Sequence, residues 1–77
     1  MTLYEFFKSN ESVTDTLTKN GIIPCLIVGY LSLYEDVLTE QDGGMIPTDS
    51  YWEVADKRNV SINTVIRAVV KMKNQIT

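Results

Sequence analysis

Apolar residues recur every three or four positions along this 77-residue chain, and no stretch alternates between apolar and polar residues for the length of a strand. A repeat of this period places the apolar side chains on one side of a helix. We therefore predict an all-α fold: a compact domain of four or five helices, joined by polar or glycine-containing turns.

The first two predicted helices are short. The first covers residues 3–8 and keeps its apolar side chains, Leu3, Phe6 and Phe7, on one side. Ser12 is the expected cap of the second helix, because its hydroxyl can accept a hydrogen bond from an otherwise unpaired backbone N–H group. Val13 and Leu17 would then face the interior, and the Asn20-Gly21 pair would end the helix.

The longest predicted helix covers residues 24–40 and opens with Pro24, whose missing N–H group has no partner to lose in a first turn. Its large apolar residues share one broad arc, which makes it the expected core helix: Leu26, Ile27, Tyr30, Leu31, Leu33, Tyr34, Val37 and Leu38. A strip of small residues lies opposite: Cys25, Gly29 and Ser32. The strip would let a helix of a second copy approach closely, but a solvated back face is the interpretation we favour.

The last part of the chain carries the pattern of a capping box. Ser50 is followed three residues later by Glu53, and in such a pair each side chain accepts a hydrogen bond from the backbone N–H group of the other residue. Because this pattern is typical of the first turn of a helix, we predict that a helix starts at Tyr51.

From residue 51 onwards the spacing satisfies the steric requirements of a helix-turn-helix, in which two helices cross steeply around a short turn. Five residues fill the constrained positions: Ala55, Asn59, Val60, Ser61 and Val65. Ala55 is small enough for the point where the helices touch, and Asn59 is one of the few residues that adopt a left-handed backbone at low cost. Ser61 is a suitable cap for the second helix. We predict this motif over about residues 51–75, in a single domain that spans residues 1–77.

The second helix of the motif, predicted over residues 62–75, has two different faces. Its inward stripe consists of Ile62, Val65, Val69, Met72 and Ile76, and its outward face consists of Asn63, Thr64, Arg67, Lys71 and Asn74. Such donor-rich side chains read base edges in the major groove, because Arg forms a forked pair with guanine and Asn pairs with adenine. The candidate DNA-binding residues are Asn63, Thr64 and Arg67 for the bases, Lys71, Lys57, Arg58 and Lys73 for the DNA backbone, and Asn74 on the same face.

The net charge of −3 on its own argues against a generic polyanion binder, but it hides a split between two parts of the chain. Residues 1–50 carry two basic and eight acidic side chains, a net charge of −6, whereas residues 51–77 carry five basic and two acidic ones, a net charge of +3. Such asymmetry is a sign of a nucleic-acid-binding face, and here it starts where the predicted motif starts.

Several classes of function are disfavoured by what the sequence lacks. It has no histidine and a single cysteine, Cys25, so we expect no structural zinc, no internal disulfide and no histidine-based catalysis. We therefore expect no enzyme, no cofactor or bound metal and no small-molecule ligand. The longest apolar stretch, residues 22–31, is too short to span a bilayer, and the first residues lack a signal-peptide pattern. We expect no membrane association and a cytoplasmic location.

Two blocks of sequence carry a family pattern. In residues 21–37 the matching positions are Pro24, Gly29, Tyr30, Leu33 and Val37, and in residues 51–70 they are Tyr51, Ala55, Lys57, Asn59, Ser61, Val65, Arg67, Ala68 and Val69. Over roughly residues 12–73 the chain resembles the C-terminal effector domain of the stage-zero sporulation response regulator family. The resemblance implies an all-helical DNA-binding domain, here in a shortened, stand-alone form.

The sequence departs from that family in two respects. Only thirteen residues separate Val37 from Tyr51, where the family has an extra helical stretch. Thr64, Ile66 and Val70 stand where the family tends to place charged contact residues, so the target DNA of the family is not carried over.

The sequence thus predicts a small transcriptional regulator that places helix 62–75 in the major groove of double-stranded DNA. Because so short a domain offers few cations, we expect a homodimer on DNA or a larger protein partner, contacted through residues 24–40 or 3–7. The alternative is a protein-interaction module, an inhibitor or adaptor of a transcription or sporulation-type regulator, that keeps the fold without binding DNA. Ile66 and Val70 favour this alternative, because aliphatic residues beside the polar face suit a protein partner.

Overall fold

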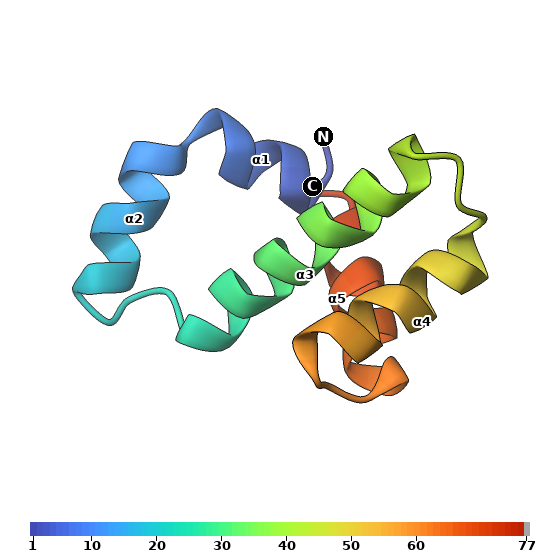
Figure 1. The fold of residues 1–77 in the computed structure, drawn as a ribbon. Coiled ribbons are helices and arrows are strands. Elements are labelled where there is room, and N and C mark those ends of the chain that lie inside the picture. Colours follow the sequence, from blue (N-terminus) through green and yellow to red (C-terminus); the bar gives the residue numbers. More distant parts are fainter. Residues whose placement is uncertain (77) are drawn as a thin grey trace.

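The computed structural model describes residues 1–76, apart from the side chain of Cys25. These residues fold into five helices: α1 (Leu3–Ser9), α2 (Glu11–Lys19), α3 (Cys25–Asp42), α4 (Pro47–Arg58) and α5 (Ile62–Lys73). Figure 1 shows α3 running across the middle of the molecule, between α2 at one end and α4 at the other. The described part of the chain contains no strand, so the predicted all-α fold is confirmed.

Three of the helices end in the same hydrogen-bonded turn. A residue with left-handed backbone lies just beyond each helix: Gly21 after α2, Gly44 after α3 and Asn59 after α4. The N–H group of the next residue bonds to a carbonyl oxygen five positions earlier, as Val60 does to Ala55 at 3.0 Å. This Schellman arrangement satisfies carbonyl groups that a helix end would otherwise leave unpaired. The predicted helix ends at Gly21 and Asn59 are confirmed.

The core lies where α3, α4 and α5 meet. Each helix contributes side chains that are at most 1% exposed: Val37 from α3, Val54 from α4, and Val65, Ala68 and Met72 from α5. The predicted inward positions Val65 and Met72 are therefore confirmed, as is Val69, which is 5% exposed, and Ile62 is half-buried against the core. Ile76 is exposed instead, because α5 ends at Lys73 and the chain beyond it turns away to pair with the first residues.

The two ends of the chain lie side by side next to α5 (Figure 1). The Leu3 N–H group donates to the Asn74 carbonyl at 2.9 Å. Thr2 and Glu5 form a capping box at the start of α1, in which each side chain accepts a hydrogen bond from the backbone of the other. The bond from the Thr2 N–H group lowers the pKa of Glu5, because it favours the ionised carboxylate. The capping box and the bond to Asn74 hold α1 in place, with Phe7 buried in the core.

Unlike the other helices, α2 stands apart from the core. None of its residues is buried, and a groove of about 500 Å³ separates it from α3. Two predictions for this helix are wrong: Asn10 rather than Ser12 occupies the N-cap position, and Val13 is 56% exposed rather than inward-facing. The amphipathic pattern identified an apolar side but not whether a neighbour covers it. Leu17, on the same side, is half-buried.

The long helix α3 reaches beyond the core at its N-terminal end. It begins at Cys25, with Pro24 as the N-cap. Leu33, Tyr34 and Val37 of the predicted apolar arc are buried, but Leu26 is 62% exposed. The prediction of a buried arc therefore holds where α3 crosses α4 and α5 and is wrong at Leu26, whereas Ile27 of the same turn is half-buried against the core. None of the described helices is long and apolar enough to cross a membrane.

One turn before its predicted start, α4 begins at Pro47, the first helical position, where no N–H group is needed. Ser50 consequently lies inside the helix and is fully buried. Its hydroxyl donates to the Pro47 carbonyl at 2.6 Å and accepts from the Gln41 side-chain amide at 3.2 Å. The predicted capping box of Ser50 with Glu53 and the predicted start at Tyr51 are therefore wrong.

Candidate nucleic-acid interface

A three-residue turn joins α4 to α5 and fixes the direction in which α5 leaves. Asn59 has φ 54° and ψ 46°, the left-handed conformation expected of it. Val60 packs against the core, and the Ser61 hydroxyl oxygen accepts the Thr64 N–H group at 3.2 Å, which caps α5. The predicted conformation of Asn59 and the predicted cap at Ser61 are confirmed. Because both ends of the turn are hydrogen-bonded, α5 is firmly placed.

Burial of one side of α5 determines which side chains face outward. Val65, Ala68, Val69 and Met72 lie in the core, which leaves the opposite side exposed. Six of the eight candidate residues belong to α5 or to its end: Asn63, Arg67, Lys71, Lys73 and Asn74 are exposed, and Thr64 is half-buried. The Thr64 hydroxyl lies 2.9 Å from the Ser61 hydroxyl, so it takes part in the cap.

The exposed positions of α5 carry positive charge only. Between Ser61 and Ile76 the chain has three basic side chains, Arg67, Lys71 and Lys73, and no acidic one. None of the three forms an ion pair with another residue in the described part of the chain. Arg67 and Lys71 are four residues apart, so they are neighbours on the same face of the helix. This face therefore offers its charge to an anionic partner.

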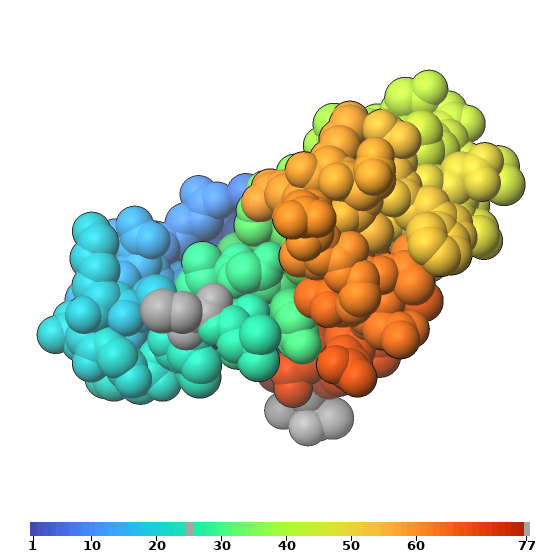
Figure 2. Space-filling view, turned by 60° about the horizontal axis from the view of Figure 1, so that its bottom comes forward, coloured from blue at the N-terminus to red at the C-terminus, as the bar shows by residue number. Residues whose placement is uncertain are grey.

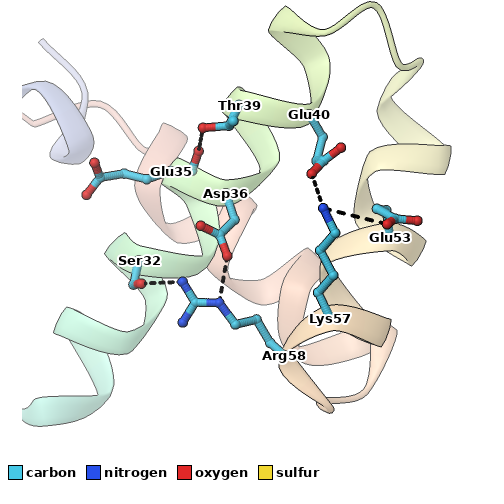
Figure 3. A network of polar contacts seen from close by, with 8 residues as sticks. All are labelled: Ser32, Glu35, Asp36, Thr39, Glu40, Glu53, Lys57 and Arg58. Carbon is cyan, nitrogen blue, oxygen red and sulfur yellow. Dashed lines mark hydrogen bonds and ion pairs between the residues drawn. The ribbon is translucent and has the colours of Figure 1, made fainter.

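Lys57, another candidate, lies near the C-terminal end of α4 and turns toward α3 (Figure 3). Its ammonium nitrogen lies 2.7 Å from a Glu40 oxygen and 3.7 Å from a Glu53 oxygen. The hydrogen bond to Glu40 raises the pKa of Lys57, because it favours the charged amine. The pair joins residues seventeen positions apart, which a local sequence pattern does not reveal.

Arg58, the last candidate, also contacts α3, although its side chain is partly exposed to solvent (Figure 3). Its Nε donates to Asp36 at 2.6 Å and its Nη2 donates to the Ser32 hydroxyl at 2.9 Å. The bond to Asp36 raises the pKa of the guanidinium further. Ser32 is consequently half-buried, so a solvated back face of α3 is wrong at this residue, whereas Gly29 is exposed as expected. The side chain of Cys25, the third residue of that strip, lies outside the described residues.

The exposed side of α5 also contains a shallow apolar depression of about 320 Å³. Its lining residues are Tyr30, Ile66, Arg67, Val70, Lys71 and Asn74. Ile66 and Val70 are exposed, as expected from their position beside the polar face. Tyr30 was expected only as part of the buried arc of α3; it is half-buried, and it reaches α5 because the two helices pack together.

In Figure 2, α5 (orange to red) is open at the surface next to α4 (yellow to orange), while α2 (light blue to cyan) lies at the far end of the molecule. Among the described residues, no group of three or more cysteine, aspartate or glutamate side chains is placed to hold a metal ion.

Comparison with protein-family models, with curated proteins and with solved structures finds no match to this chain. The candidate interface therefore has to be interpreted from its own residues.

Proposed function

We propose that the protein is a small DNA-binding transcriptional regulator that inserts α5 into the major groove of double-stranded DNA. The observation that carries this proposal is the set of exposed positions of α5, which includes three cations and no carboxylate, with Arg67 and Lys71 on the same face. Neutralisation of phosphate charge supplies most of the affinity in non-specific DNA binding. Asn63 and Arg67 add donor and acceptor groups that distinguish one base pair from another.

The arrangement of α4 and α5 supports the assignment to a helix-turn-helix. The connection is three residues long, Asn59 supplies its left-handed position, and the small residue Ala55 is buried where the helices approach. In this motif the N-terminal residues of the second helix contact base edges. The resemblance to the sporulation effector domain implies the same placement of α5.

Within this proposal the residues of α5 divide by position. Asn63 and Arg67 lie in the first half of the helix and would read bases, whereas Lys71 and Lys73 lie in the second half and would contact phosphate. Asn74, just beyond the helix, would reach the DNA backbone. Thr64 is half-buried and takes part in the cap, so we assign it a role in orienting α5 rather than a strong contact with DNA.

We assign Lys57 and Arg58 a smaller share in DNA binding. To reach phosphate, each side chain would have to give up its bonds to α3, to Glu40 for Lys57 and to Asp36 for Arg58. These bonds are charge-assisted, and such bonds are stronger than those between neutral groups. The cations of α4 therefore hold α4 against α3, and the cations of α5 meet the DNA.

A titration of the protein with random-sequence duplex DNA tests the proposal. We expect binding at low salt that weakens steeply as salt is added, because each phosphate contact releases a counterion. Absence of binding at low salt would contradict the proposal. The same titration separates DNA binding from the second candidate function described below.

Selection from random duplexes would then supply a site for testing Arg67. Substituting Arg67→Ala should weaken binding to the selected site by about 1–3 kcal/mol, the range for loss of a contact to a base. The matched control is Arg67→Lys, which keeps the charge but loses the planar fork. We expect this variant to bind random DNA like the wild type and to lose affinity for the selected site. Unchanged affinity of both variants for that site would remove Arg67 from base reading.

A second candidate function is a protein-interaction module that inhibits or adapts another regulator. The depression that contains Ile66, Val70 and Tyr30 favours it, because exposed aliphatic and aromatic groups suit a protein surface. Under this alternative the protein would bind no duplex DNA at any salt concentration, and the partner would contact the depression together with the acidic part of the chain.

Three basic side chains are few for a specific regulator, so we propose that two copies bind DNA together. Of the two contact segments that the sequence suggested, residues 3–7 are largely engaged with their own core, since Phe7 is buried. The first turns of α3 expose Leu26 and Val28 and are better suited to a second copy. Sizing of the complex on a selected duplex should give two copies per site, and one copy per site would contradict this expectation.

A further inference from the structure

The outward side of α5 is interrupted by two aliphatic residues. Ile66 is 41% exposed and Val70 is 59% exposed, although Val65 and Val69 next to them are buried. Both belong to the depression that Tyr30 closes on the α3 side. Hydrogen bonds to phosphate or to base edges, which explain the polar residues of this face, give these two side chains no role.

We propose that Ile66 and Val70 contact thymine methyl groups, so that the protein selects sites with A·T base pairs under this part of α5. This inference rests on the proposed DNA-binding function. The C5-methyl group of thymine is the apolar feature that base pairs present in the major groove, and apolar side chains recognise it by contact. An aliphatic pair on the groove-facing side of a recognition helix is therefore placed to detect thymine.

The spacing of the two residues fits two thymines on a DNA strand. Ile66 and Val70 are four residues apart, which is about 6 Å along a helix axis at 1.5 Å per residue. Successive bases of one strand lie about 3.4 Å apart, so the two side chains span about two base steps. Asn63 and Arg67 are also four residues apart and lie beside Ile66 and Val70 on the helix surface. The methyl contacts of Ile66 and Val70 would therefore lie next to the hydrogen bonds of Asn63 and Arg67.

The apolar residues of the depression also suit a protein surface, but its extent and charge favour a base edge. A stable protein interface takes about 800 Å² from each partner, roughly 20–30 residues on each side. The depression is lined by six residues, of which Tyr30, Ile66 and Val70 are apolar and both charged members are basic. The methyl group of a thymine in DNA needs contact with only one or two apolar side chains, and here these lie next to Arg67 and Lys71.

The experiment compares two short duplexes of alternating A·T pairs, one with thymidine and one with deoxyuridine, which lacks only the methyl group. Binding is measured at low salt for both. Because every base pair of the duplex carries the substitution, the comparison does not depend on the position at which the protein binds. We expect the thymidine duplex to bind about fourfold more tightly for each contacted methyl, the equivalent of about 0.8 kcal/mol.

A pair of variants assigns the effect to α5. Val70→Ala should bring the ratio of the two affinities closer to one, because it removes the contacting methyl groups. Val13→Ala is the matched control, since Val13 is a valine on α2 with a similar exposed fraction, 56% against 59%. We expect this control to keep the wild-type ratio. Circular dichroism of both variants should show unchanged helix content, because both side chains are exposed.

Each outcome bears on one of the two proposals. Equal affinity of the wild-type protein for the thymidine and deoxyuridine duplexes would overturn the methyl contact and leave DNA binding intact. Failure to bind either duplex or random-sequence DNA at low salt would overturn the proposed function, and this inference with it. A ratio that Val13→Ala lowers as much as Val70→Ala would overturn the assignment to α5.

Discussion

The helices α2 and α5 are both amphipathic, but α5 carries more apolar residues and the two lie in very different environments. Four residues of α5 are buried, whereas α2 buries none. Their neighbours add to this difference, because α3 and α4 pack against α5 while α2 packs mainly against α1. An amphipathic pattern thus identifies the side of a helix that can be buried, and the rest of the fold decides whether it is.

The same difference separates the two helices as binding surfaces. A recognition surface needs side chains held in fixed positions by packing and hydrogen bonds. On α5 the Asn59 turn, the Ser61 cap and the buried side provide this support. On α2 the Asn10 side chain makes no capping bond, and no side is anchored in the core. Exposed cations on α5 are therefore held in more fixed positions than exposed cations on α2. The sequence alone does not reveal this difference, because both helices have an amphipathic pattern.

The largest expected contrast between the helices is in stability. Met72 of α5 is fully buried, so Met72→Ala should lower the free energy of unfolding by about 2–5 kcal/mol. In α2, Val13→Ala should change it by less than about 0.5 kcal/mol, because the side chain is exposed. Urea unfolding followed by circular dichroism measures both. Similar losses for the two variants would show that α2 is packed as tightly as α5.

A smaller contrast concerns the helix caps. The Ser61 hydroxyl caps α5, so Ser61→Ala should destabilise the protein by about 1 kcal/mol. Ser12, the cap that the sequence suggested for α2, lies inside that helix and makes no capping bond. Ser12→Ala should therefore leave the urea midpoint almost unchanged. A larger effect at Ser12 than at Ser61 would contradict the observed caps.

The smallest effect comes from the ion pairs that tie α4 to α3. Glu40 raises the pKa of Lys57 above its ordinary value of 10.5. A cation with a raised pKa in the folded state stabilises the fold at lower pH, and this contribution is lost as the pH rises through that pKa. The unfolding free energy should therefore decrease above a pH of about 10.5, and less so in Glu40→Gln. The effect is small because the pair is partly exposed. Equal decreases in both proteins, measured by urea unfolding, would argue against the pair.

Local chemistry made much of the fold predictable. The helix ends at Gly21 and Asn59 and the cap at Ser61 follow from the conformations that these residues prefer, and the structure has all three. The capping box at Ser50 failed because Pro47 starts the same helix a turn earlier, which leaves Ser50 inside it. Two local signals competed there, and in the structure Pro47 starts the helix while the Ser50 hydroxyl bonds to Pro47 and Gln41 instead of capping it.

Contacts between distant residues limited the prediction of the candidate site. The outward residues of α5 follow from helical periodicity, so Arg67 and Lys71 were placed from sequence. Lys57 is a lysine and exposed, as Lys71 is, yet it forms an ion pair with Glu40, which lies on another helix. Tyr30 likewise reaches the apolar depression only because α3 packs beside α5. Periodicity describes one helix at a time and carries no information about such neighbours.

The most direct test of the central claim, that the cations of α5 meet DNA phosphate, is the salt dependence of binding. The affinity for a random-sequence duplex is measured over a range of salt concentrations for the wild type, Lys71→Ala and Lys19→Ala. We predict that Lys71→Ala reduces the slope of log affinity against log salt by about 0.9, the value for one lost phosphate contact. Lys19→Ala, which removes an exposed cation from α2, should leave the slope unchanged. The same slope for all three proteins, or a slope reduced as much by Lys19→Ala as by Lys71→Ala, would contradict the assignment of α5.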